Sequence, residues 1–124
     1  MLKKLVERAL ENLSSKEVFL FRISCGNCGR DCSGKPVRFS KAGASLTTRS
    51  ARILYEALYE QEFKTAMQVA VLTASEQLNH CPICKRLVCN QCFLICQDLD
   101  MCRQCATALE QQGQPVQTSF LEVI

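Results

Sequence analysis

The stretch that decides the fold is CPICKRLVCNQC, residues 81–92, because it holds two C-x2-C pairs with only four residues between them. Two further pairs, Cys25/Cys28 and Cys102/Cys105, bring the paired cysteines to eight of the ten in the chain. A C-x2-C turn directs two thiolates at one ion, whereas a structural disulfide stabilises most when it closes a long loop. The four tight pairs therefore indicate metal sites rather than a disulfide framework.

The rest of the composition fits a small metal-stabilised domain. The chain has 124 residues, 48% of them hydrophobic and none of them tryptophan, so its core is modest and mostly aliphatic. Charged residues run through positions 3–8, where a secretory signal would be apolar. No run of about eighteen apolar residues predicts a membrane span. We therefore expect a cytoplasmic, reducing location and two bound zinc ions.

Spacing also predicts which pairs share an ion. Two C-x2-C turns on one ion need about a dozen residues between them to turn back, so Cys84 and Cys89 belong to different ions. The 17 residues between Cys84 and Cys102 suit that length, whereas the 9 between Cys92 and Cys102 are too few. The predicted sets are interleaved: Cys25, Cys28, Cys89 and Cys92 form site one, and Cys81, Cys84, Cys102 and Cys105 form site two.

This interleaved pattern, with its central run C-x2-C-x4-C-x2-C, resembles the cross-brace (double treble-clef) zinc fingers of the FYVE type. The resemblance covers the cysteines of residues 81–105 and the distant Cys25/Cys28 pair, and it implies a two-zinc cross-brace core. FYVE domains bind a phosphoinositide headgroup through a basic, double-histidine stretch. Residues 78–80 here read Leu-Asn-His, and the tryptophan of the family's upstream motif is absent. A membrane lipid headgroup is therefore not an expected partner, and we interpret His80 as an ordinary loop histidine.

Cys32 and Cys96 are left over, and each follows a pair by four residues, in C-x2-C-x3-C. Three interpretations stay open. The first is that both are small buried apolar side chains. The second is a thiol-redox device, in which a spare thiol displaces a ligand or forms a Cys32–Cys96 disulfide. The third is an iron–sulfur cluster, because thiolates also bind iron.

Helical patterns dominate the remainder of the chain. Apolar residues recur every three or four positions over 2–13, which predicts an amphipathic helix, and over 48–78, which has no glycine or proline. Whether 48–78 is one helix or two is left open. Residues rich in β-formers predict short strands at 18–23 and 36–39, and 103–111 reads as a final helix.

These patterns predict an α+β, helix-rich fold. We expect one zinc-binding domain over 1–112, with its zinc core at 25–32 and 81–105. The N-terminal helix should pack on the long helical insertion at about 48–78. Residues 113–124, which begin with the helix-stopping Gly113, are expected to form a flexible tail.

The net charge of +3 is unevenly placed, because residues 30–52 hold six basic residues and one acid. A basic Gly/Ser-rich loop beside a zinc site suits an anion such as a phosphate backbone. It also suits a solvated loop that keeps the protein soluble. The candidate anion-binding residues are Arg30, Lys35, Arg38, Lys41, Arg49 and Arg52.

The sequence offers no constellation for catalysis. It has one histidine and no glycine-rich phosphate loop, so we expect a protein that is not an enzyme. The predicted function is a zinc-binding adaptor or regulatory subunit whose partner is another protein. A nucleic-acid-binding zinc finger is the first alternative, and a redox or iron–sulfur protein is the second. The long apolar helix could also pair with a second copy of the chain.

Overall fold

The computed structural model describes residues 2–113, so all but the first residue of the predicted tail 113–124 lies outside the described part. The described chain divides into two compact units. The helical unit comprises mainly residues 3–23 and 33–76, and the cysteine unit comprises mainly residues 24–32 and 77–113. The helix-rich α+β class is confirmed, with strands that pair only in short antiparallel hairpins.

The long insertion forms one continuous helix, α2 (Arg49–Gln77), which settles the question of one helix or two. The Thr48 hydroxyl accepts a hydrogen bond from the Ala51 backbone N–H at 3.0 Å, so Thr48 caps the exposed amides at the helix start. No glycine or proline interrupts the following residues. The helix ends where the chain becomes strand at Leu78.

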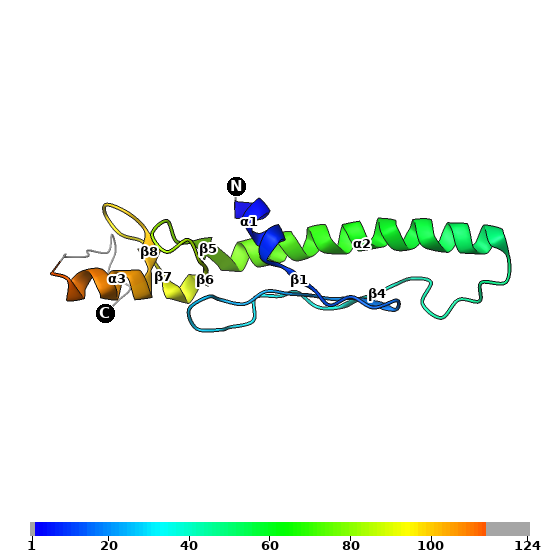
Figure 1. The fold of residues 1–124 in the computed structure, drawn as a ribbon, viewed down its shortest axis with the longest axis horizontal. Coiled ribbons are helices and arrows are strands. Elements are labelled where there is room, and N and C mark those ends of the chain that lie inside the picture. Colours follow the sequence, from blue (N-terminus) through cyan, green and yellow to red (C-terminus); the bar gives the residue numbers. More distant parts are fainter. Residues whose placement is uncertain (1, 114–124) are drawn as a thin grey trace. The chain divides into compact units, whose positions relative to one another are not determined.

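Two short ribbons lie along α2 in the helical unit (Figure 1). Strand β1 (Glu11–Asn12) pairs with β3 (Phe21–Arg22), and β2 (Val18–Phe19) pairs with β4 (Val37–Arg38). The predicted strand at 18–23 is therefore two strands that change partner at Leu20.

The change of partner at Leu20 has a local cause. The Ser14 hydroxyl accepts a hydrogen bond from the Leu20 N–H at 3.0 Å and donates to the Leu20 carbonyl. The Leu13 N–H also donates to that carbonyl, at 2.8 Å. Because the Leu20 backbone groups are taken by residues 13 and 14, the strand ladder is interrupted there.

The expected helix over 2–13 is shorter than predicted. Helix α1 spans Leu2–Ala9, and residues 11 and 12 pair with β3 instead. The apolar repeat at Leu10 and Leu13 misled the prediction because Leu10 packs on the core of the helical unit from outside the helix. Val6, in contrast, is fully buried.

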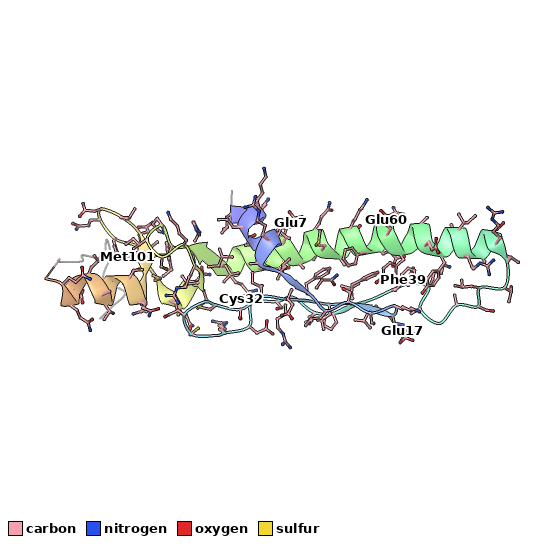
Figure 2. All side chains as sticks on the ribbon, in the orientation of Figure 1. Glu7, Glu17, Cys32, Phe39, Glu60 and Met101 are labelled. Carbon is pink, nitrogen blue, oxygen red and sulfur yellow. The ribbon has the colours of Figure 1, made fainter. Side chains whose placement is uncertain are left out.

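An aromatic cluster forms the core of the helical unit. Phe19 and Phe39 are 1% exposed, and both reach Tyr59 of α2, with ring centroids 5.1 and 5.2 Å apart. Figure 2 shows Phe39 between the ribbon and α2, with Glu60 on the opposite face of the helix. The ribbons therefore cover the apolar stripe of α2 between Tyr55 and Ala70, a surface that we expected α1 to cover.

The cysteine unit is built from two hairpins, a 3-10 turn and a helix. Strand β5 (Leu78–His80) pairs with β6 (Leu87–Cys89), and β7 (Phe93–Leu94) pairs with β8 (Met101–Cys102). The turn η1 (Asn90–Cys92) follows β6 directly. Helix α3 (Arg103–Gln111) has the predicted bounds, and Gly113 follows it in the left-handed conformation, at φ +84°.

Candidate metal centres

The eight paired cysteines gather into two groups, both within the cysteine unit. Within each group all four sulfur atoms lie within 4.8 Å of one another. The grouping is the interleaved one that spacing predicts, an arrangement compatible with a cross-brace zinc finger. Site one holds Cys25, Cys28, Cys89 and Cys92, and site two holds Cys81, Cys84, Cys102 and Cys105.

The sulfur–sulfur distances suit a single tetrahedral ion in each site. The Cys28 and Cys89 Sγ atoms of site one are 3.8 Å apart, and the Cys84 and Cys102 Sγ atoms of site two are 3.7 Å apart. Four thiolates around one ion at about 2.3 Å define a tetrahedron with edges of about 3.8 Å. A disulfide would bring two sulfurs to about 2.05 Å, and the eight paired cysteines form none.

Cys25 and Cys28 of site one lie on a tight turn closed by two backbone hydrogen bonds. The Gly29 N–H donates to the Cys25 carbonyl at 3.0 Å, and the Cys25 N–H donates to the Arg30 carbonyl at 2.9 Å. Gly29 has φ +78°, a left-handed conformation that glycine adopts without steric cost. We call residues 25–30 the first knuckle.

Residues 81–86, the second knuckle, repeat this geometry at site two. The Lys85 N–H donates to the Cys81 carbonyl and the Cys81 N–H donates to the Arg86 carbonyl, both at 2.9 Å. Lys85 takes the place of Gly29, with φ +67°. The shared pattern C-x2-C-x-R, visible in the sequence at both knuckles, was a signal that the sequence analysis missed.

The second pair of each site begins a helical turn. In site one, Cys89 precedes the 3-10 turn η1 and Cys92 is its last residue. In site two, Cys102 is the N-cap of α3, and its sulfur accepts a hydrogen bond from the Cys105 N–H at 3.4 Å. The exposed amides at a helix start favour negative charge. Cys102 and Cys105 therefore place their sulfurs at the start of α3, the end of a helix that favours a negatively charged group.

The β5–β6 hairpin explains why Cys84 and Cys89 serve different ions. The second knuckle is the tip of this hairpin, and strand β6 then leads away from it to Cys89. Three extended residues advance the chain by about 10 Å, which is more than the span of one tetrahedral site.

Hydrogen bonds lower the thiol pKa of Cys25 in site one and of Cys81 and Cys84 in site two. Burial raises the pKa of Cys25, but backbone N–H groups of Cys28, Cys89 and Asn27 outweigh it and lower that pKa to about 6. Burial also raises the pKa of Cys84, but hydrogen bonds from the Arg86 guanidinium, the Arg86 backbone N–H and the Cys81 and Cys105 thiols together outweigh it, again lowering the pKa to about 6. Each site thus holds a thiolate near neutral pH.

The opposite shift affects another ligand in each site. Burial, together with hydrogen bonds to the other thiols of the same set, raises the pKa of Cys92 and of Cys105 to about 12. Four thiolates cannot all ionise together without added positive charge. A bound cation supplies that charge, and this chemistry fits both donor sets.

The two spare cysteines lie outside both sets of ligands. Cys32 is fully buried, and its thiol donates to the Arg30 carbonyl at 3.6 Å. The Cys96 thiol donates to the Leu94 carbonyl at 3.8 Å. Burial, followed by the charges of Cys89 and Cys25, raises the pKa of Cys32. These surroundings favour the interpretation of small buried side chains over a reactive thiol.

His80 is not a loop residue, as the sequence analysis expected, but the last residue of β5, where it pairs with Leu87. It belongs to neither set of ligands among the described residues. The six candidate anion-binding residues are all exposed. Arg30 lies in the cysteine unit, and the other five, Lys35, Arg38, Lys41, Arg49 and Arg52, lie in the helical unit.

Comparisons with protein-family models, with curated proteins and with solved structures found no match to this chain. Among residues 2–113, no helix combines the length and the apolar character that crossing a membrane requires. The class of the protein therefore rests on its own geometry: a helix-rich α+β chain with two interleaved four-cysteine sets placed to hold metal ions.

Proposed function

We propose that the protein is a non-enzymatic, zinc-stabilised interaction module that binds another protein. The observation that supports it is the closure of both sites. Each contains four cysteine sulfurs within 4.8 Å of one another, which fill all four positions of a tetrahedral ion. Four-cysteine sites are structural in zinc proteins, whereas catalytic zinc keeps one position open for water or substrate.

Zinc is favoured over an iron–sulfur cluster by the spacing of the sulfurs. A cluster distributes its cysteine ligands over several iron atoms, which spreads the sulfurs further apart than one ion does. The 3.7 and 3.8 Å separations in site two match a single tetrahedral ion. The tetrahedral all-thiolate set suits zinc among the divalent metals.

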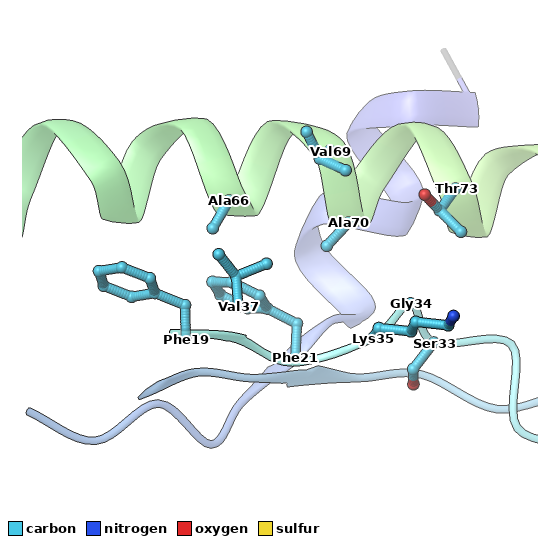
Figure 3. A pocket seen from close by; sticks show the side chains of 10 residues that line it. All are labelled: Phe19, Phe21, Ser33, Gly34, Lys35, Val37, Ala66, Val69, Ala70 and Thr73. Carbon is cyan, nitrogen blue, oxygen red and sulfur yellow. The ribbon is translucent and has the colours of Figure 1, made fainter. Parts of the chain in front are cut away.

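A groove in the helical unit supports the protein-binding part of the proposal. It has a volume of about 530 Å³ and lies between α2 and the ribbons (Figure 3). Val37 and Val69 at its rim are 46% and 53% exposed, and the Lys35 ammonium adds positive charge at one end. An apolar side chain of a partner, next to an acidic one, would suit it. The groove is lined by Phe19, Phe21, Ser33, Gly34, Lys35, Val37, Ala66, Val69, Ala70 and Thr73.

Metal analysis tests the first half of this proposal. Protein purified under reducing conditions without added metal should contain about two zinc ions per chain and show no visible absorption. Iron with absorption in the visible range would contradict the zinc assignment.

Site-specific photo-cross-linking in the native cell tests the second half. A photoreactive residue at Val69, in the groove, should form adducts with a defined partner protein. The same residue at Glu60, on the opposite face of α2 (Figure 2), is the matched control. Equal adducts at both positions would contradict a partner specific to the groove.

Nucleic-acid binding is a second candidate, and the exposure of all six basic residues of 30–52 favours it. The ion pair between Lys64 and Glu60 lies outside this segment. Labelled duplex DNA and RNA should then bind with an affinity that falls steeply with salt. The double variant R38Q/K41Q should reduce that salt dependence, and a flat salt response would exclude this candidate.

Self-association through α2 also stays a proposal. Ile53 and Leu54 in its first half are 58% and 59% exposed, so two adjacent large apolar side chains are free to contact a second copy. Sedimentation of the wild-type protein and of an I53E/L54E variant would test it, because a dimer held by this face should dissociate in the variant.

A further inference from the structure

Arg86 contacts ligands and backbone on several sides. Its Nε donates to the Cys84 Sγ at 3.3 Å, and its Nη2 lies 3.7 Å from the Cys102 Sγ. The guanidinium thus bridges thiolates from both halves of site two. It also donates from Nη1 to the carbonyl of Gly26, in the first knuckle, and from Nη2 to the Gln104 side chain of α3.

Backbone contacts reinforce this link between the sites. The Gly26 N–H donates to the Leu87 carbonyl at 2.8 Å, and the Cys89 N–H donates to the Cys25 Sγ at 3.2 Å. A Cβ added at Gly26 would lie 3.1 Å from the Leu87 carbonyl oxygen and 3.4 Å from the Arg86 Cβ. The first knuckle therefore approaches Arg86 and Leu87 as closely as a glycine allows.

We propose that Arg86 is a positioning residue shared by both metal sites, and that it makes metal binding at the two sites cooperative. The proposal rests on the proposed metal-binding function. A metal ion at site two holds Cys84 and Cys102 where the guanidinium can bridge them. The same guanidinium then holds the Gly26 carbonyl and, with it, the knuckle that carries Cys25 and Cys28.

Charge adds to this geometric coupling. A divalent ion with four thiolates leaves each site with a net charge of −2, and Arg86 reduces that charge at site two through charge-assisted hydrogen bonds. Hydrogen-bond partners of metal ligands typically alter metal affinity by about 10–100-fold when removed. By linkage, anything that strengthens site one when site two is filled must strengthen site two when site one is filled.

The chain contains a matched control at the same position of the other knuckle. Arg30 follows Cys28 as Arg86 follows Cys84, and its carbonyl makes the same backbone hydrogen bond. The Arg30 side chain is exposed, and none of the hydrogen bonds in the described residues joins its guanidinium to a ligand sulfur. R30M and R86M therefore make the same chemical change, with a bridging guanidinium lost only in R86M.

The test is competition for zinc by a chromophoric chelator, with the wild-type protein, R30M, R86M and R86K. Replacing zinc by ¹¹³Cd gives one resonance per site and so identifies which ion leaves first. We expect wild type and R30M to release both ions in one transition. In R86M the site-two ion should leave at about 10–100-fold lower chelator concentration, and site one should weaken with it. R86K should lie between, because lysine keeps the charge but lacks the planar fork.

Release curves that coincide for R86M and R30M would overturn the proposal. So would an R86M protein in which site two weakens while site one keeps its wild-type affinity, because the coupling would then be absent. If R86M does not fold, R86K decides, and a wild-type curve for R86K overturns the proposal. A wild-type protein that binds no metal would refute the proposed function itself, an outcome distinct from these.

Discussion

Removal of metal should unfold the cysteine unit and leave the helical unit folded. Apart from cysteines, the buried apolar side chains within residues 24–32 and 77–113 of the cysteine unit are four: Leu78, Val88, Met101 and Ala106. Each contributes at most about 1.5–3 kcal/mol by burial, whereas each structural zinc ion contributes about 10–16 kcal/mol in peptide models. The metal terms are therefore several times larger than the apolar ones in this unit.

The helical unit has its own source of stability. Its aromatic cluster packs Phe19 and Phe39 against Tyr55, Tyr59 and Phe63 with no metal ligand involved. Helices α1, α2 and α3 hold 8, 29 and 9 residues, so loss of α3 alone removes about a fifth of the helical circular dichroism. Most of the helical signal should therefore survive chelation.

The chain offers separate reporters for the two units. Its two tyrosines, Tyr55 and Tyr59, both lie in α2, so near-ultraviolet circular dichroism of tyrosine reports the helical unit. Amide hydrogen exchange over 78–80, 87–89 and 101–111 reports the cysteine unit. After an excess of chelator under reducing conditions, exchange protection should vanish in those segments while the tyrosine signal stays. Protection that survives with less than one metal per ten chains would refute the reasoning.

Three further predictions follow from particular side chains. F39A should lower the free energy of unfolding of the helical unit by about 3–5 kcal/mol, the usual cost of deleting a buried ring. Urea denaturation followed by the tyrosine circular dichroism signal measures this change. The control E60A, which removes an exposed ion pair, should lower it by less than about 1 kcal/mol. Metal-dependent stability should fall as pH falls from about 9 toward about 6, because the cysteines have a pKa near 9 when unfolded, whereas folding alone lowers the pKa of Cys25 and Cys84 to about 6. Bound metal keeps the thiolates deprotonated to still lower pH, so the unfolded state takes up protons over this window while the folded state does not. Unfolding of the metal-loaded protein that is insensitive to pH over that window would contradict this. G29A should destabilise the first knuckle by about 1 kcal/mol through its left-handed backbone alone, because nothing lies within 4 Å of the added Cβ. K85G, at the matching position of the second knuckle, should be neutral or stabilising. Equal melting temperatures for metal-loaded G29A and wild type would count against this account.

The ligand sets were predictable from sequence because most of their signals are local, and the distant Cys25/Cys28 pair then joined Cys89/Cys92 by elimination. A C-x2-C turn is completed within six residues, and loop length alone separates Cys84 from Cys89. The helical character of residues 48–78 was predictable for the same reason, since a run without glycine or proline and with helical periodicity needs no distant partner to begin. Whether it formed one helix or two was left to the structure. The class of the fold followed from these two signals together.

The limits of sequence reasoning appear where distant residues compete for one backbone or one surface. The apolar repeat continued through Leu10 and Leu13, yet strand pairing with residues 21 and 22 ended the helix at Ala9. Likewise, the apolar stripe of α2 showed that something must cover it, but not that aromatic side chains of two ribbons would do so.

By itself, the sequence determined the α+β class, the helical character of residues 48–78 and the two four-cysteine sets, because helical periodicity and C-x2-C turns are local patterns and the short loop assigns Cys84 and Cys89 to different ions. That residues 49–77 form one unbroken helix was decided only by the structure. Only the tertiary structure decided which elements cover α2, where α1 ends, and that Arg86 of one knuckle reaches the backbone of the other. Those outcomes depend on contacts between residues about 10 to 60 positions apart. Bringing such residues together closes a loop of the chain, and the packing of the whole unit, rather than any local pattern, compensates for the entropy lost.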